Sequence, residues 1–200
     1  MMPAPAIPDV RVCAFDSVTV RVDYATGRVT AATGATAEAW SQAPGVIQGV
    51  RWGLSFGAEE ADVEPSTAAR PTVRDSVATA AALVVTLVVR SLGPSERAMS
   101  RLTGLATTAA HLTATPSHTN EAGRVVSAVR WASRWIPFRI ACLEESIAAV
   151  LVLAARRRSV TWCHGVAPDP VQFHAWIQTH GSPLAEPPTT SRYTVLHTIP

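Results

Sequence analysis

The segment from Leu143 to Ala155 constrains the fold of this chain more than any other. It reads Leu-Glu-Glu-Ser-Ile-Ala-Ala-Val-Leu-Val-Leu-Ala-Ala, and a helix of that composition is apolar on nearly every side. Because such a helix has no face suited to water, it has to be buried among other elements. Pro137 breaks the preceding helix, and Arg156-Arg157-Arg158 follow at the end where cations suit the helix dipole. The sequence therefore predicts a buried helix over 143–155.

Strand patterns occur near both ends of the chain. Between Val10 and Ala32 apolar and polar residues tend to alternate on β-branched side chains, which is typical of half-buried strands. We expect a three-stranded antiparallel meander at about 10–15, 18–23 and 28–32, and then a short helix ending at Trp40. After Ser159 the pattern predicts strands at 160–166, 173–179 and 191–198, with a hairpin turn at 180–183.

Helices occupy most of the chain between these two regions. The pattern predicts helices over 72–90, 94–112 and 121–135. Residues 46–56 fit a strand or a helix equally, and the acidic, Pro-containing stretch 58–71 is expected to be a linker. The apolar run from Ala78 to Val89 is too short to span a bilayer, so we expect a buried helix there, with peripheral membrane contact as the alternative.

The charge and cysteine content exclude several classes of function. A net charge of +2 gives no basic footprint for nucleic acid. The first eight residues lack the charged and apolar regions of a secretory signal, so we expect a cytoplasmic protein with reduced thiols. The three cysteines do not have metal-ligand spacing. Cys13 and Cys163 are expected to be buried structural residues, because Cys163-His164 lacks a second ligand pair.

Cys142 and His174 are the candidate reactive pair. Cys142 stands at the start of the apolar helix, where the partial positive charge of unpaired N–H groups favours thiolate. His174 lies on a predicted strand, on the face opposite Phe173 and Ala175, and could act as a general base and then acid. A polar group must orient the histidine, and Glu186 is the acidic residue beyond the turn at Gly181; Gln178 is a neutral alternative.

The residues around this pair resemble the lasso-peptide B proteins, which are transglutaminase-like cysteine peptidases. The similar segments are Ala141-Cys142-Leu143-Glu144-Glu145-Ser146, Gly165-Val166, Phe173-His174-Ala175-Trp176-Ile177, and then Gly181, Glu186 and the strand around Tyr193. Relatives usually have Asp where this chain has Glu186, and Val-Asp-Gly where it has Thr179-His180-Gly181. His180 could compete as the orienting group, but we expect it in an exposed turn.

The N-terminal segment resembles a precursor-peptide recognition element. The resemblance is carried by two strands, Asp23-Tyr24-Ala25-Thr26-Gly27-Arg28, a third strand, and a helix ending in Trp40. Such elements are winged-helix-like and capture a leader peptide as an added strand at a sheet edge. The resemblance therefore implies leader binding at Arg28, Val29 and Thr30, with the helix from Thr72 as the other wall of the groove.

Together these observations predict an α+β protein. A three-stranded winged-helix-like recognition element with its linker would occupy residues 1–90, and a helical segment with a papain/transglutaminase-like peptidase domain would occupy 91–200. The resemblance implies removal of the leader from a ribosomally made lasso precursor. A partner cyclase similar to asparagine synthetase would then close the macrolactam. ATP would belong to that cyclase, and we expect this chain to bind no cofactor or metal. A transglutaminase-like acyl transferase and a catalytically silent peptide-binding scaffold are the alternatives.

Overall fold

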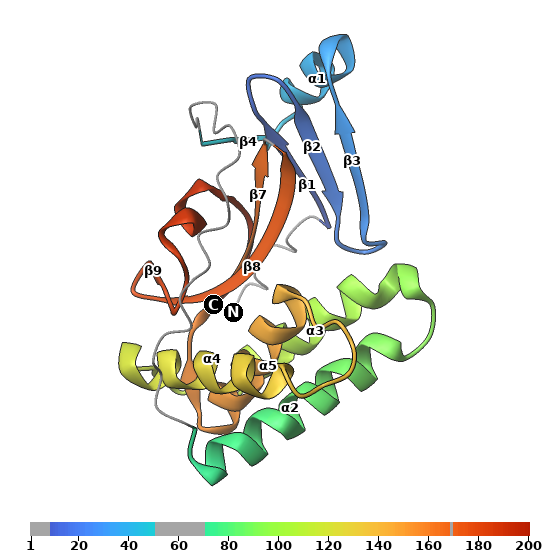
Figure 1. Ribbon diagram of the computed structural model, residues 1–200. Coiled ribbons are helices and arrows are strands. Elements are labelled where there is room, and N and C mark those ends of the chain that lie inside the picture. Colours follow the sequence, from blue (N-terminus) through green and yellow to red (C-terminus); the bar gives the residue numbers. More distant parts are fainter. Residues whose placement is uncertain (1–8, 51–70, 169) are drawn as a thin grey trace, which may run out of the picture.

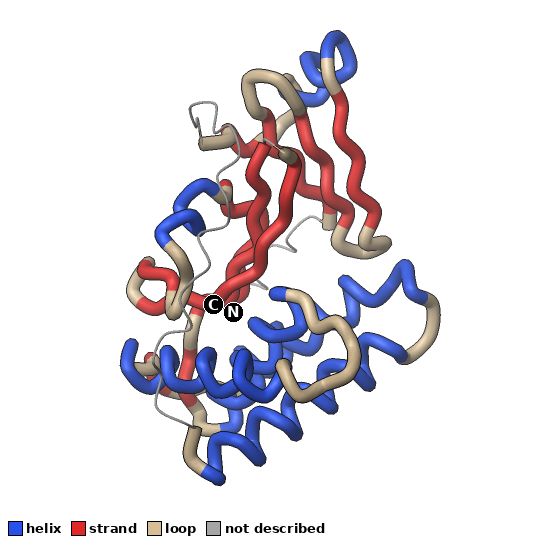
Figure 2. The backbone as a smooth tube through the Cα atoms, viewed as in Figure 1, coloured by secondary structure: helices blue, strands red, loops and turns tan. Residues whose placement is uncertain are grey.

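The computed structural model describes residues 9–50, 71–168 and 170–200. Figure 1 shows two sheets above the four longer helices, with α1 (Gly34–Ser41) beside the N-terminal sheet, and Figure 2 shows the same arrangement by secondary structure. The molecule is a mixed α+β fold, as the sequence predicts, with a small N-terminal sheet followed by helices and a second sheet. Within the described ranges, no helix has the length and apolarity needed to cross a bilayer.

The N-terminal sheet contains the predicted meander and one additional strand. Its strands are β1 (Val10–Ala14), β2 (Thr19–Asp23), β3 (Arg28–Ala32) and β4 (Ile47–Gln48), in the spatial order β3-β2-β1-β4. The first three pair antiparallel, which confirms the meander, and α1 (Gly34–Ser41) follows them. β4 pairs parallel with β1, so the sheet has four strands rather than three. Two residues carry too little pattern to reveal such a strand, and the expected linker at 58–71 lies almost wholly outside the described residues.

Four longer helices form the lower part of the molecule. They are α2 (Val73–Ser91), α3 (Ala98–Ala110, after a 3-10 turn at Ser95–Arg97), α4 (Thr119–Ser133) and α5 (Cys142–Ala155). Thr72 caps α2 by accepting a hydrogen bond from the Asp75 amide. The chain approaches α4 through a two-residue strand, β5 (Thr115–Pro116), which pairs parallel with β6 (Arg158–Ser159).

α5 is the buried helix that the composition predicts. It packs against α2, α3 and α4 and against the second sheet. Ile147, Ala148 and Leu153 are fully enclosed in the hydrophobic core. α2 belongs to the same core through Leu83 and packs mainly on α4 and α5. The packing therefore does not support the expectation that the helix from Thr72 borders the third strand as a groove wall.

The second sheet has the order β10-β7-β8-β9. Its strands are β7 (Thr161–Pro168), β8 (Val171–Thr179), β9 (Ser182–Pro183) and β10 (Thr194–Ile199). β8 and β9 form the predicted hairpin around His180 and Gly181, which both have positive φ, as a two-residue turn requires. The last strand starts later than expected, because Pro188–Arg192 form a 3-10 turn.

A second hydrophobic cluster joins the two sheets. Val20 and Val22 from the N-terminal sheet pack there with Val166, Leu196 and Phe173 from the second sheet. Phe173 is the neighbour of His174 in the sequence, so this contact between the sheets reaches the strand that carries the candidate histidine.

Candidate active site

Cys142 is the first residue of α5 and is partly exposed. The Glu144 carboxylate accepts a hydrogen bond from the Ala141 amide at 3.0 Å, and it satisfies one of the free N–H groups at the helix start. Arg90 lies 2.8 Å from the same carboxylate, so the buried negative charge of Glu144 is paired. Cys142 lies at the positive end of the α5 dipole, which favours a negative charge on its sulfur.

His174 lies on β8 among aromatic side chains. Its ring stacks against Trp176, with 5.7 Å between centroids, and lies 5.2 Å from the Tyr193 ring. Gly165 faces His174 from β7. A Cβ at Gly165 would lie 2.8 Å from the Thr194 carbonyl oxygen and 3.0 Å from the Trp176 ring. The lack of a side chain at residue 165 thus leaves the space in which Trp176 supports the histidine.

Glu186 reaches His174 from the segment after β9. Its Oε2 lies 2.7 Å from His174 Nε2, and the Thr190 hydroxyl donates a hydrogen bond to the same oxygen at 3.3 Å. Arg130 pairs with the other carboxylate oxygen. The Glu186 side chain is only 4% exposed, so these contacts hold a charged group that solvent hardly reaches. Of the three orienting groups considered from the sequence, Glu186, Gln178 and His180, the structure shows Glu186 hydrogen-bonded to His174.

The surroundings of His174 favour its protonated form. Burial by itself lowers the pKa of the imidazole, but hydrogen bonds and charge interactions with Cys142 and Glu186 outweigh it and raise the pKa to about 9. Because Nε2 faces Glu186, Nδ1 is the nitrogen left for the sulfur. At neutral pH the imidazole is therefore protonated beside the Cys142 sulfur, and a cysteine next to a cationic imidazole is an activated nucleophile.

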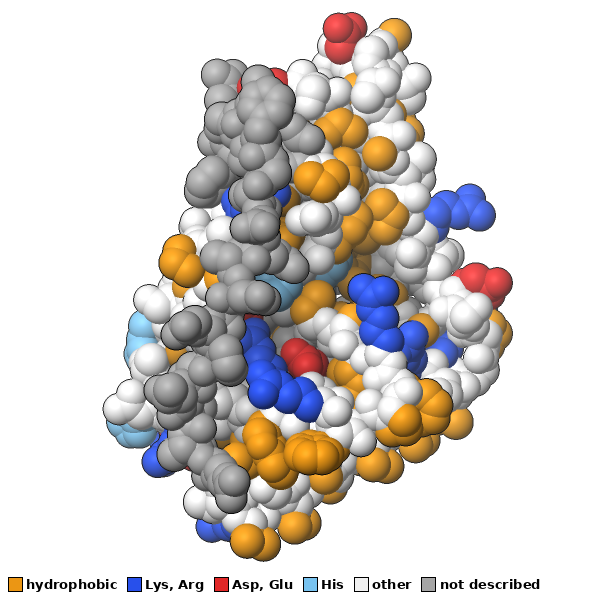
Figure 3. All heavy atoms as spheres, viewed as in Figure 1, with side chains coloured by type: hydrophobic (Ala, Val, Ile, Leu, Met, Phe, Trp, Pro, Cys, Tyr) orange, Lys and Arg blue, Asp and Glu red, His pale blue; other side chains and the backbone are white. Residues whose placement is uncertain are grey.

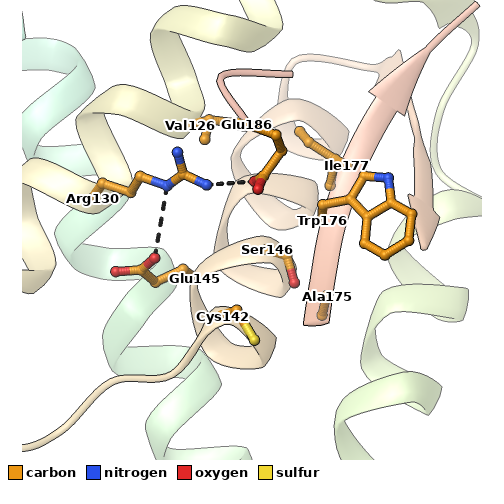
Figure 4. Close-up of a pocket in the computed structure, with 9 residues that line it drawn as sticks. All are labelled: Val126, Arg130, Cys142, Glu145, Ser146, Ala175, Trp176, Ile177 and Glu186. Carbon is orange, nitrogen blue, oxygen red and sulfur yellow. Dashed lines mark hydrogen bonds and ion pairs between the residues drawn. The ribbon is translucent and has the colours of Figure 1, made fainter. Parts of the chain in front are cut away.

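A small pocket opens beside the Cys142 sulfur. Figure 4 shows Cys142 at the start of α5 with its sulfur directed toward β8, and Arg130 reaching from α4 between Glu145 and Glu186. The pocket is lined by Val126, Arg130, Cys142, Glu145, Ser146, Ala175, Trp176, Ile177 and Glu186. In Figure 3, basic and acidic side chains meet in a hollow between the helices and the strands.

The other sequence-predicted residues lie elsewhere. Arg28, Val29 and Thr30 are exposed on β3, at the edge of the N-terminal sheet, and the structure does not bring them to Cys142. His180 is in an exposed turn, as expected. Cys13 and Cys163 are buried, and burial raises the pKa of each thiol to about 12. In the described part of the chain, no three His, Cys, Asp or Glu residues are grouped as a metal site would need.

Arg130 is the residue at this site that the sequence did not reveal. It is an ordinary surface arginine by its position on an amphipathic helix, and it stands far from Glu186 in the sequence. Only the packing of α4 beside the segment after β9 brings the two together.

Comparison with known proteins supports the same interpretation of the fold. No curated protein and no solved structure matches the chain. A family model described as the transglutaminase-like superfamily matches residues 81–198. The match begins inside α2, covers more than half of the chain, and includes Cys142, His174 and Glu186. With a cysteine at a helix start and a histidine on the following sheet, the chain belongs to the transglutaminase-like superfamily.

Proposed function

We propose that this protein is a cysteine peptidase that removes the leader from a ribosomally made lasso precursor. The observation that carries the proposal is the hydrogen-bonded chain of Cys142, His174 and Glu186. The family supports cysteine-based acyl chemistry in general. The lasso substrate rests on the resemblance of the motifs around Cys142 and His174, together with the open edge of β3.

In the proposed reaction, the Cys142 thiolate attacks the carbonyl carbon of the bond that joins leader and core. A carbon–sulfur bond forms, the carbon–nitrogen bond breaks, and His174 gives its proton to the departing amine of the core peptide. His174 then takes a proton from a water molecule, whose oxygen attacks the thioester carbon. A carbon–oxygen bond forms, the carbon–sulfur bond breaks and returns the Cys142 thiolate, and the leader leaves as a carboxylate after losing its remaining proton to solvent. Glu186 holds the imidazole in place through both steps. The freed amine is the group that a partner cyclase would join to an acidic side chain.

The edge of the N-terminal sheet supports the recognition half of the proposal. Among the residues that the structure describes, β3 pairs with β2 on one side only, and Val29 is 46% exposed there. An extended leader can add a strand to such an edge through main-chain hydrogen bonds. Leader capture at β3 and cleavage at Cys142 would then take place on one folded unit, because the two sheets share a hydrophobic cluster.

Two other functions use the same features. A transglutaminase-like acyl transferase would form the same thioester and pass it to an amine instead of water, because nothing in a Cys–His pair excludes an amine acceptor. A peptide-binding scaffold would use β3 and leave Cys142 idle. The mass of the product distinguishes acyl transfer from hydrolysis. Removal of the Cys142 thiol distinguishes the scaffold from the peptidase, because only the peptidase needs that thiol.

The first experiment is intact-mass analysis of a candidate precursor incubated with this protein and its cyclase. Wild type is compared with Cys142→Ala and with Cys163→Ala, which makes the same change at a buried thiol. We expect leader loss with wild type and Cys163→Ala, and none with Cys142→Ala. Equal processing by all three proteins would eliminate the peptidase proposal. A product heavier by an added amine would establish acyl transfer instead.

A further inference from the structure

We propose that Arg130 is a positioning residue that holds Glu186 against His174 and so keeps the imidazole aligned with Cys142. The inference rests on the proposed roles of Cys142 and His174. The single guanidinium group of Arg130 joins α4, α5 and the segment after β9 around the site.

The guanidinium of Arg130 holds two consecutive residues at once. Nη2 pairs with Glu186 Oε1, and Nη1 donates a hydrogen bond to the Ala185 carbonyl oxygen. Figure 4 shows the side chain crossing from α4 to the segment that carries Glu186. Two hydrogen bonds from one planar group fix both the position and the direction of their acceptors. Oε2 of Glu186 is thereby directed to His174.

The backbone before Glu186 shows why such a hold is needed. Ala185 has a φ of 53°, a left-handed conformation that is unfavourable for a residue with a Cβ. A residue of this kind keeps that conformation only where the surroundings impose it. The hydrogen bond from Arg130 to the Ala185 carbonyl acts directly on this residue. Without it, we expect the segment to relax and to carry the Glu186 carboxylate away from His174.

Arg130 is itself held from α5. Its Nε lies 3.9 Å from Glu145 Oε2, and the Ser133 hydroxyl donates a hydrogen bond to Glu145 Oε1 at 2.6 Å. The helix that starts with Cys142 and the residue that orients His174 are therefore connected through one cation. Glu145 and Glu186 also place two negative charges in the pocket of Cys142, and Arg130 compensates for part of that charge.

The test measures how the alkylation rate of Cys142 by iodoacetamide depends on pH in Arg130→Met and wild type. The titratable and charged groups around His174 are Cys142 and Glu145 on α5, Glu186, Arg130, and His164 on β7. The alkaline inflection of the rate profile is the pH at which His174 loses its proton. Removing the positive charge of Arg130 would, by charge alone, raise the pKa of His174 and move this inflection to higher pH. Loss of the Glu186 contact would move it to lower pH. The sign of the shift therefore distinguishes a positioning role from a charge effect.

We expect Arg130→Met to lower the alkaline inflection by about one pH unit and to slow precursor cleavage by tenfold or more. Arg130→Lys keeps the charge but cannot hold both acceptors, so its inflection should fall between the other two. Arg158→Met is the matched control. The Arg158 side chain is 34% exposed against 32% for Arg130, and each arginine pairs with a glutamate, which for Arg158 is Glu121. Arg158→Met should behave as wild type.

An unchanged or raised inflection in folded Arg130→Met would overturn the proposal. If Arg130→Met does not fold, the alkylation profile of Arg130→Lys is the test. A wild-type profile in Arg130→Lys would then overturn the proposal. The alkylation profile requires no precursor. Failure of wild type to cleave the precursor therefore refutes the proposed function, while the profile still judges the role of Arg130.

Discussion

The Tyr24 hydroxyl lies 2.7 Å from His164 Nδ1, in a buried contact that joins the N-terminal sheet to β7. Burial lowers the pKa of His164 to about 4, so the imidazole is neutral at physiological pH and one ring nitrogen can accept a hydrogen bond. The His164 ring stacks between Trp162 and Phe173. This polar contact therefore lies inside the aromatic packing that joins the N-terminal sheet to the sheet of His174.

Replacing Tyr24 with Phe should reduce the stability of the whole protein. The change removes the hydroxyl and leaves the buried nitrogen of His164 without its partner, at a cost of about 1–3 kcal/mol. Urea unfolding followed by both far-UV circular dichroism and tryptophan fluorescence measures the loss, and the two probes should report one transition. A variant as stable as wild type would show that this contact contributes nothing to the joining of the sheets.

One cysteine should react in the folded protein. Cys13 and Cys163 are buried with thiol pKa values near 12, whereas Cys142 is partly exposed beside the pocket. At pH 8 we expect intact mass to show one carbamidomethyl group per native chain and three after unfolding in guanidinium. Cys142→Ala should take up none while folded, and labelling of a second native thiol would contradict the structure.

Stability should fall as the pH rises through the range in which His174 loses its proton. The folded-state pKa of about 9 lies above the ordinary value of 6.5, so the folded protein binds this proton more tightly than the unfolded chain does. The contribution is fully present below pH 6.5 and is lost as the pH rises through 9, at up to about 1.4 kcal/mol per pH unit. Urea unfolding at intervals from pH 6 to 10 measures it. His174→Gln should show a flatter dependence, and parallel curves would exclude this linkage.

Gly165→Ala should destabilise the protein and disturb the site. The new Cβ would lie 2.8 Å from the Thr194 carbonyl oxygen and about as close to the Trp176 ring, so backbone or ring must move. We expect a loss of about 1–3 kcal/mol and slower alkylation of Cys142. Gly104→Ala is the control, because nothing lies within 4 Å of the added carbon and the site is in the middle of α3. Gly104→Ala should raise the free energy of unfolding by about 0.5–1 kcal/mol. A Gly165→Ala protein more stable than Gly104→Ala would contradict the packing.

A charge on β3 should weaken leader binding without affecting the active site. Val29→Asp places a carboxylate at the open edge, and we expect the affinity for a precursor leader to fall at least tenfold by fluorescence anisotropy. The control is Val195→Asp, since Val195 is 36% exposed on β10, the edge of the second sheet. Both variants should keep the wild-type rate of Cys142 alkylation. Equal affinities for the leader would place its binding site elsewhere.

Local patterns in the sequence predicted most of the elements. Alternation over residues 10–32 identified β1 to β3, and the apolar composition of 143–155 identified the buried helix. These patterns are local because a strand or helix must present its apolar residues to one core. β4 has only two residues and its pairing with β1 is long-range, so no periodicity could reveal it. The packing of α2 against α4 and α5 is equally a matter of tertiary contacts.

The sequence alone determined which residue types could react: a cysteine at a helix start, a histidine on a later strand, and an acid after the next turn. Only the tertiary structure decided that Glu186 lies 2.7 Å from His174 and that Arg130 holds it from another helix. The reason is physical. Chemical type and helix or strand propensity depend on neighbours in the sequence. The contact between Arg130 and Glu186 joins residues far apart in the chain, and it exists only because α4 and α5 share one core beside β8.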